Sequence, residues 1–244
     1  MTDSGADTDR RSSNGRVVKA KGVWRVYHSG VQKVEALRGV DLEVPSGRFV
    51  AVTGRSGSGK STLLNCIGGL DRPTSGSIHV FDHPLSEMAE EEVTRWRREN
   101  VGFVFQSFGL LPTLSAYENV ELVLRIAGVD QKERRKRTEH CLDLVGLREW
   151  AQHRPHEMSG GQQQRVGIAR ALANHPKLIL ADEPTGELDS ETASQILSIF
   201  QDVIANENVT IVVASHDPMI GEYVDEVVQL KDGQIVGHEK EASR

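Results

Sequence analysis

The fold class is decided by one stretch of the chain, Gly54-Arg55-Ser56-Gly57-Ser58-Gly59-Lys60-Ser61-Thr62. This stretch follows an apolar run at 49–52 and precedes a segment of helical character at 63–67. The spacing G-x-x-x-x-G-K-[ST] between a strand and a helix predicts a phosphate-binding loop. The glycines let the backbone N–H groups converge on phosphate oxygens, and the following helix adds its positive dipole end. A chance Gly/Ser-rich turn is the alternative, but it would not require the flanking strand and helix.

Two side chains of this phosphate loop (residues 54–62) are suited to bind the nucleotide and its metal ion. Lys60 is long enough to reach the β- and γ-phosphates of a nucleoside triphosphate, and the Ser61 hydroxyl is suited to bind Mg²⁺. The predicted nucleotide-binding residues of the loop are Gly54, Arg55, Ser56, Gly57, Ser58, Gly59, Lys60, Ser61 and Thr62.

The size and composition of the chain exclude several classes of protein. Its 244 residues carry a net charge of −6, which argues against a dedicated nucleic-acid-binding protein, and no nucleic-acid partner is expected. The cysteines, Cys66 and Cys141, are expected to be reduced, as in a cytosolic protein. No apolar run approaches the length of a membrane span, so we expect any membrane contact to be made through a partner.

The hydrophobic pattern predicts an α/β fold with a mostly parallel sheet. Apolar strands are expected at 49–53, 101–105, 178–181 and 209–214, with helices between them. The first third of the chain also contains patterns typical of antiparallel hairpins. Residues 1–15 are polar and predict a disordered tail. We expect a single domain over 16–240, with a helical sub-domain at about 107–165.

A second functional stretch, residues 178–183, is an apolar strand that ends in two adjacent carboxylates. Ligands bind at the carboxyl ends of the strands in open α/β sheets. Asp182 is therefore placed to hold Mg²⁺ through water, and Glu183 to polarise an attacking water molecule. A strand that runs into an acidic surface turn would have the same pattern. The phosphate loop in the same chain favours the nucleotide interpretation.

A third stretch is the signature segment, residues 159–162, with the sequence Ser159-Gly160-Gly161-Gln162. Ser159 is a favourable N-cap, and the two glycines leave backbone N–H groups unshielded at the positive end of a helix. One nucleotide does not need two such helix ends from one molecule. We therefore expect the segment to close over the γ-phosphate of ATP held by a second subunit. An ordinary capped helix is the alternative.

The order of these motifs resembles the ATP-binding cassette (ABC) ATPases over about residues 17–236. The signature segment distinguishes that family from other P-loop NTPases. Residues 34–40, 102–108 and 181–186 look most like the MacB/LolD-like group, which acts in macrolide export and lipoprotein release. The resemblance implies a P-loop NTPase fold with a RecA-like core, an antiparallel β sub-domain and a helical sub-domain.

The resemblance also implies roles for residues outside these three stretches. Tyr27 would stack on adenine, and Gln106 would contact Mg²⁺ and sense the γ-phosphate. Asp189 would order the opposite site across a dimer interface, and His216 would contact the γ-phosphate and the attacking water. Each residue has an ordinary alternative role: a half-buried strand residue, a polar loop residue, a helix N-cap and a surface histidine respectively.

All the groups needed for ATP hydrolysis are present, so the resemblance implies an active ATPase with ATP and Mg²⁺ as cofactors. The expected catalytic residues are Lys60, Glu183 and His216. The expected Mg²⁺ ligands are Ser61, Gln106 and Asp182. Arg55 stands where the group more often has proline, which leaves its effect on nucleotide affinity open.

The sequence therefore predicts the ATP-binding subunit of an ABC transporter. ATP would close a homodimer, and hydrolysis would power an integral membrane permease of the MacB/LolD type on a separate chain. The permease would dock near residues 105–112 and hold the subunit at the cytoplasmic face of the inner membrane. A membrane partner that regulates cell-wall hydrolysis or division, without transport, is the alternative. Three other classes fit less well. ABC ATPases of DNA repair or chromosome maintenance carry a long coiled-coil insertion, which is not visible here. Translation-type factors carry two cassettes in one chain, whereas one is present here, and a P-loop kinase would lack the signature helix.

Overall fold

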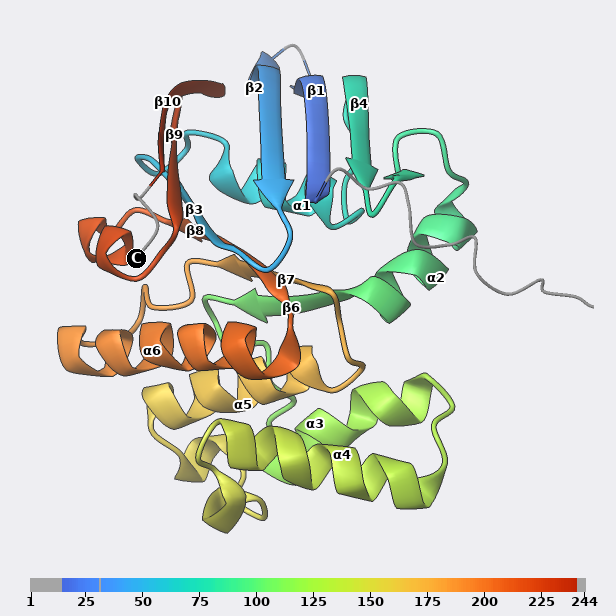
Figure 1. Ribbon diagram of the computed structural model, residues 1–244, viewed down its shortest axis with the longest axis vertical. Coiled ribbons are helices and arrows are strands. Elements are labelled where there is room, and N and C mark those ends of the chain that lie inside the picture. The colour runs from blue at the N-terminus through green and yellow to red at the C-terminus, as the bar shows by residue number, and fades with distance from the viewer. Residues whose placement is uncertain (1–14, 31, 241–244) are drawn as a thin grey trace, which may run out of the picture.

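The computed structural model describes residues 15–30 and 32–240, so the predicted disordered tail lies outside the described residues except for Gly15. Two sheets organise these residues (Figure 1). The first sheet is antiparallel and has four strands in the order β2-β1-β4-β5. Its strands are β1 (Arg16–Ser29), β2 (Gln32–Pro45), β4 (Ser75–Val80) and β5 (His83–Pro84).

The second sheet has six strands in the order β10-β9-β3-β8-β7-β6 and is parallel except for β10, its edge strand. Its strands are β3 (Phe49–Thr53), β6 (Val101–Phe105), β7 (Leu178–Asp182), β8 (Thr210–Ser215), β9 (Glu226–Lys231) and β10 (Gln234–Lys240). The central strands are covered on both faces, which explains why they are continuous apolar runs rather than alternating ones.

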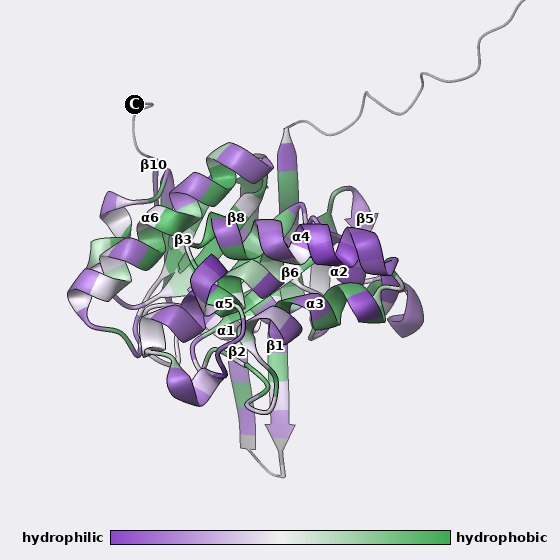
Figure 2. Ribbon diagram, turned by 90° about the horizontal axis from the view of Figure 1, so that it is seen from below, coloured by the Kyte–Doolittle hydropathy of each residue, from purple (hydrophilic) through white to green (hydrophobic). Residues whose placement is uncertain are grey.

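In the described part of the chain, six α-helices cover this sheet or extend away from it (Figure 1). They are α1 (Lys60–Ile67), α2 (Glu90–Asn100), α3 (Ala116–Ile126), α4 (Gln131–Leu144), α5 (Gly160–Leu172) and α6 (Ser190–Glu207), with short 3₁₀ helices at Arg148–Trp150, Pro155–Glu157 and Pro218–Glu222. Helix α4 is largely hydrophilic in Figure 2, whereas the strands behind it are hydrophobic. No helix of the described part is long and apolar enough to span a membrane.

Strand β3 lies between two hydrophobic cores because its side chains alternate between the two faces of the sheet. Val50 and Val52 pack into a core with α1 and the antiparallel sheet. Phe49 and Ala51 pack into the other core, where the Phe49 ring meets Phe200 of α6 edge-on at 5.8 Å. The loop that follows β3 is therefore anchored in both halves of the molecule.

The α/β fold with a mostly parallel sheet agrees with the sequence prediction, and each expected strand is present within a few residues. Strand β5 was not expected, because two residues are too short to produce a periodic pattern. The helices α3 and α4 fall within the predicted sub-domain at about 107–165. They pack on α5, which continues into the core of the domain, so the division into sub-domains stays a prediction.

Candidate nucleotide-binding site

The phosphate loop joins β3 to α1 and has a backbone that only glycine adopts without strain. Gly59 has φ 105°, and a Cβ atom at this position would lie 2.4 Å from the carbonyl oxygen of Ala36. Any other residue would therefore displace the loop from β2. The loop is also held from the far end of the chain, because the N–H of Gly233 donates to the carbonyl oxygen of Ser58 at 2.9 Å.

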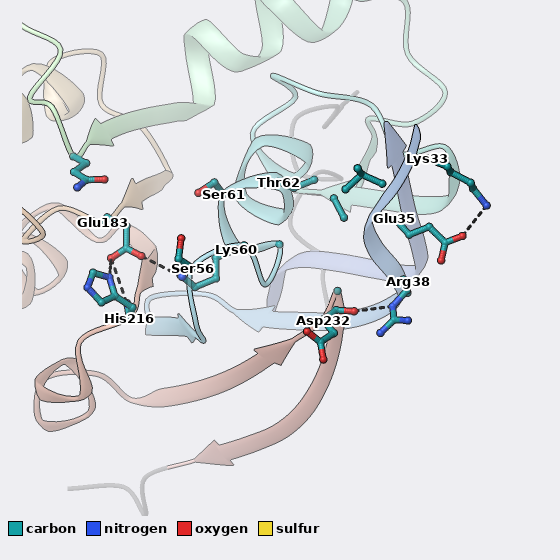
Figure 3. A pocket seen from close by; sticks show the side chains of 16 residues that line it. Lys33, Glu35, Arg38, Ser56, Lys60, Ser61, Thr62, Glu183, His216 and Asp232 are labelled. Atoms are coloured by element: carbon teal, nitrogen blue, oxygen red, sulfur yellow. Dashed lines mark hydrogen bonds and ion pairs between the residues drawn. The ribbon is translucent and has the colours of Figure 1, made fainter. Parts of the chain in front are cut away.

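A cavity of about 970 Å³ opens over the phosphate loop (Figure 3). Its floor is formed by Ser56, Gly57, Gly59, Lys60, Ser61 and Thr62 of the loop. Gln106, Glu183 and His216 line one side, and Lys33, Val34, Glu35, Ala36, Arg38, Asp232 and Gly233 line the other. The structure thus brings the predicted catalytic residues together at the carboxyl ends of neighbouring strands.

Lys60, Glu183 and His216 form a connected network of polar contacts at the centre of the cavity (Figure 3). The Lys60 ammonium donates to the carbonyl oxygen of Gly54 at 2.8 Å and lies 3.2 Å from Oε1 of Glu183. The other carboxylate oxygen of Glu183 lies 2.8 Å from Nδ1 of His216 and accepts the His216 backbone N–H at 3.2 Å. Glu183 is therefore held from both sides.

Ser61 and Asp182 meet at the edge of this network. The Ser61 hydroxyl donates to Oδ1 of Asp182 at 2.9 Å, and burial raises the pKa of the Asp182 carboxyl. A hydroxyl and a carboxylate oxygen at this spacing are hard oxygen ligands of the kind that Mg²⁺ prefers. The donor set therefore fits Mg²⁺. Among the described residues, no cluster of three or more His, Cys, Asp or Glu forms a separate metal site.

Tyr27 does not line the cavity. Its hydroxyl donates to Oδ2 of Asp71 at 2.5 Å, and the Arg25 guanidinium lies over its ring, 4.3 Å from the centroid. The tyrosine thus has partners within β1 and the turn after α1. Its predicted stacking on adenine stays a prediction.

Three positions of the phosphate loop also lie outside the cavity lining. Arg55 has an exposed side chain, Gly54 contributes its carbonyl oxygen to Lys60, and Ser58 is buried beneath the loop. Of these, Arg55 is the only one with a charge, and its side chain points to solvent rather than into the lining.

The signature segment caps α5 and also lies outside the cavity lining. The Ser159 hydroxyl accepts the N–H of Gln162 at 3.3 Å, and the Gln162 side chain accepts the N–H of Ser159 at 2.9 Å. Gly160 and Gly161 form the first turn of the helix. Asp189 caps α6 in the same way, because its carboxylate accepts the N–H of Thr192 at 3.0 Å. Within one chain these residues do not meet the phosphate loop.

The sequence reasoning missed the residues of β2 and of the β9–β10 turn that line the cavity. The dipeptide Asp232-Gly233 is typical of a hairpin turn, but no local pattern predicts where in the fold that turn lies. Arg38 donates through Nε to the carbonyl oxygen of Asp232 at 2.7 Å, and through its backbone N–H to Gly233 at 2.8 Å (Figure 3). These contacts join segments that are far apart in the sequence, and no local pattern predicts them.

A family model described as "ABC transporter" matches residues 37–186. The chain belongs to the ABC transporter family. An uncharacterised ABC transporter ATP-binding protein of Thermotoga maritima is 49% identical over 228 residues, which cover 92% of this chain and 96% of that protein. The macrolide export ATP-binding/permease protein MacB of Wolinella succinogenes is 43% identical over 93% of this chain, which spans 35% of MacB.

The solved structures include an ABC cassette of the same fold. The dimeric ATP-binding cassette MJ0796 of Methanocaldococcus jannaschii, in a post-hydrolysis state bound to ADP and Pi, matches with a TM-score of 0.85. It is 43% identical, and the match covers 93% of this chain and 100% of that one. The family and the fold class predicted from the sequence are thus confirmed. The chain is an ABC ATPase with a P-loop NTPase fold.

Proposed function

We propose that this ABC ATPase is the ATP-binding subunit of a transporter of the MacB/LolD type, and that it works as an ATP-closed homodimer on a membrane permease. One observation supports the proposal above all others. The cavity unites the phosphate loop with Lys60, Glu183 and His216, while the signature segment of the same chain lies elsewhere. A complete site then requires the signature segment of a second copy.

In this proposal Glu183 accepts a proton from the water that attacks the γ-phosphate. Its carboxylate is oriented by His216 on one side and by Lys60 on the other. On ATP binding, the Lys60 ammonium would turn from Glu183 to the phosphate oxygens, which frees the carboxylate to act as a base. Mg²⁺, held by Ser61, Asp182 and Gln106, would neutralise phosphate charge.

The dimer would be held together by ATP itself. The N–H groups at the start of α5 and the dipole of that helix favour an anion, so the signature segment would bind the γ-phosphate held by the partner. Asp189, at the start of α6, would lie at the same interface. Hydrolysis and phosphate release would remove this attraction and open the dimer. The dimeric MJ0796 cassette supports this arrangement.

The permease would dock in a second cavity, of about 400 Å³, between α2, β6 and α3. Three large apolar side chains are exposed there: Leu70 at 47%, Phe105 at 40% and Ile126 at 61%. Exposed apolar side chains gathered in a groove are typical of a protein interface. The groove includes part of the region at 105–112 that the sequence reasoning selected.

The groove is also basic, which indicates the chemistry of the docking segment. Arg97, Arg98 and Arg170 line it. Arg170 donates to the carbonyl oxygens of Phe108 and Gly109, which are neutral, and burial lowers the pKa of its guanidinium. A partly desolvated cation gains most from a carboxylate partner. We therefore propose an amphipathic permease segment that carries at least one acidic residue. Docking there would place the subunit at the cytoplasmic face of the membrane.

The variant Glu183→Gln tests the shared site, because it keeps the size of the side chain and removes the base. We expect ATP hydrolysis to fall more than about 100-fold while ATP binding persists, so that an ATP-bound dimer accumulates. Phosphate release and light scattering after gel filtration measure the two effects. Glu222→Gln, an exposed carboxylate outside the cavity lining, is the matched control and should behave as wild type. A Glu183→Gln chain that stays monomeric in saturating ATP would refute the shared site.

A further inference from the structure

Gln164, the fifth residue of α5, has a fully buried polar side chain that contacts the segments following β6 and β7. Its Nε2 donates to the carbonyl oxygen of Pro184 at 2.6 Å and of Phe105 at 3.3 Å. Because both neighbours are acceptors, the amide must turn its NH₂ group toward them. One amide thus joins α5 to the ends of β6 and β7.

Each of the two carbonyl groups adjoins a residue of the proposed catalytic machinery. Phe105 immediately precedes Gln106, and Pro184 immediately follows Glu183. The backbone of Glu183 has φ 47°, a left-handed conformation that is costly for a residue with a side chain. Such a conformation persists only where the surroundings fix it. The Glu183 N–H donates to Ala214 at 2.9 Å on one side, and Gln164 holds Pro184 on the other.

The same helix begins at the signature segment, one turn before Gln164. An α-helix moves as a rigid rod over so short a distance, so a displacement of the signature segment is transmitted to the Gln164 amide. The buried Oε1 of Gln164 has no hydrogen-bond partner within residues 15–30 and 32–240. An apolar side chain would fill this space without an unpaired acceptor. The amide is therefore explained better by its two donated hydrogen bonds than by packing.

We propose that Gln164 is a positioning residue that couples the signature segment of one chain to Glu183 of the same chain. When the signature segment engages the partner's nucleotide, α5 shifts, and the Gln164 amide sets the peptide that follows Glu183. Each site then becomes competent for hydrolysis only after the other has closed. This inference rests on the proposed shared-site dimer and adds the link between its two sites.

The variant Gln164→Met tests the coupling, since methionine matches the volume of glutamine and cannot donate a hydrogen bond. We expect kcat for ATP hydrolysis to fall at least about tenfold, KM to change less than about threefold, and the Hill coefficient to move toward one. Gln163→Met is the matched control. Gln163 is the preceding residue of α5, and its side-chain amide donates to the carbonyl oxygen of Met158, just before the helix, rather than to the segments that follow β6 and β7. This control should keep the wild-type kcat and Hill coefficient.

A second variant separates positioning from packing. In Gln164→Glu the buried side chain can donate a hydrogen bond only when it is protonated, and burial favours the protonated form. We expect kcat of this variant, relative to wild type, to rise as the pH falls from 8 to 6, whereas Gln164→Met should show no such rise. Thermal unfolding of each variant checks that the chains compared are folded.

The outcomes separate this inference from the function on which it rests. A wild-type chain that closes with ATP, together with a Gln164→Met chain of normal kcat and Hill coefficient, would overturn the coupling alone. An equal loss of kcat in Gln164→Met and Gln163→Met would overturn it too. A wild-type chain that stays monomeric in ATP would overturn the shared site, and the coupling with it.

Discussion

Single residues of the nucleotide site are held by charge compensation within the chain. The Lys60 side chain is only 5% exposed, and its ammonium is surrounded by backbone carbonyls and the Glu183 carboxylate. These partners offset the desolvation free energy that an unpaired buried cation would cost. In the proposed function, ATP phosphate would have to replace these partners of Lys60, so nucleotide affinity would depend on Glu183 as well as on the loop.

Gly59→Ala is expected to destabilise the fold by about 3 kcal/mol, because the added methyl group would meet a backbone oxygen in a strained conformation. Urea unfolding measures the change. Gly57→Ala is the matched control: its φ is 77°, but a Cβ atom there would have no neighbour within 4 Å. In the control, the free energy of unfolding should fall by about 1 kcal/mol, because the left-handed backbone conformation alone disfavours alanine. Equal losses in the two variants would show that contact with Ala36 does not matter.

The site residues that could be predicted from the sequence are those that belong to a motif of consecutive residues. The phosphate loop and the Asp182–Glu183 pair can each be recognised from a few consecutive positions. The environment of Tyr27 was not predictable, because Arg25 and Asp71 reach it only after the antiparallel sheet and the turn after α1 have formed. An aromatic residue on a strand has the same pattern whether its face meets a nucleobase or a guanidinium.

At the scale of elements, an ion pair fastens α4 to the end of α6. Arg137 of α4 is buried and donates to Glu207 at 2.8 Å and to the carbonyl oxygen of Leu172 at 2.7 Å. His140 reaches the same carboxylate at 2.9 Å. Burial opposes ionisation of Glu207, but the hydrogen bonds from Arg137 and His140 outweigh it and lower the pKa of that carboxyl. The pair therefore holds the helical region against the core.

Glu207→Gln is expected to lower the free energy of unfolding by about 1–2 kcal/mol at pH 7, a modest loss because solvent partly screens the pair. Since the folded pKa lies below the unfolded value, this stabilisation is present above the unfolded pKa. It disappears as the pH falls through the folded pKa. The difference between wild type and variant should thus shrink below about pH 4.5. Urea titrations over pH 3–7 measure it.

The control for this prediction is Glu139→Gln, which breaks an exposed pair with Arg135 on the same helix. The side chains of that pair are 44% and 75% exposed, so its loss should change stability less. A Glu207→Gln chain as stable as the Glu139→Gln chain at pH 7 would contradict the role given to the buried pair.

The elements themselves followed closely from the sequence. Continuous apolar runs predicted the strands of the parallel sheet, and Ser159 and Asp189 were recognised as N-cap residues at the starts of helices. The pairing of strands was not predictable in this way. β3 takes β8 and β9 as neighbours rather than the strands closest to it in the sequence, since partner choice depends on the packing of the whole domain.

At the scale of the whole molecule, the basic apolar groove is expected to decide membrane association. Ile126→Asp places a carboxylate on the most exposed apolar side chain of the groove and should repel an acidic docking segment. Affinity purification of the tagged chain from native membranes should recover an integral membrane protein with wild type. The variant should recover at least about tenfold less, with ATP hydrolysis in solution unchanged.

Val236→Asp is the control for this experiment. Val236 is an apolar residue of similar exposure, 56% against 61% for Ile126, and it lies on β10 outside the groove. Its substitution should leave recovery of the membrane protein at the wild-type level. Equal recovery with Ile126→Asp and wild type would refute docking in the groove.

The sheet order has a consequence for how the chain is made. A ribosome releases β3 and the phosphate loop early, but the strands that flank β3 are β8 and β9, near the other end of the chain. The turn that supports the loop through Gly233 emerges later still. Until then both apolar edges of β3 are unpaired. In the proposed function, the nascent chain would therefore acquire nucleotide binding only near the end of translation, and ATP could not close a dimer of incomplete chains.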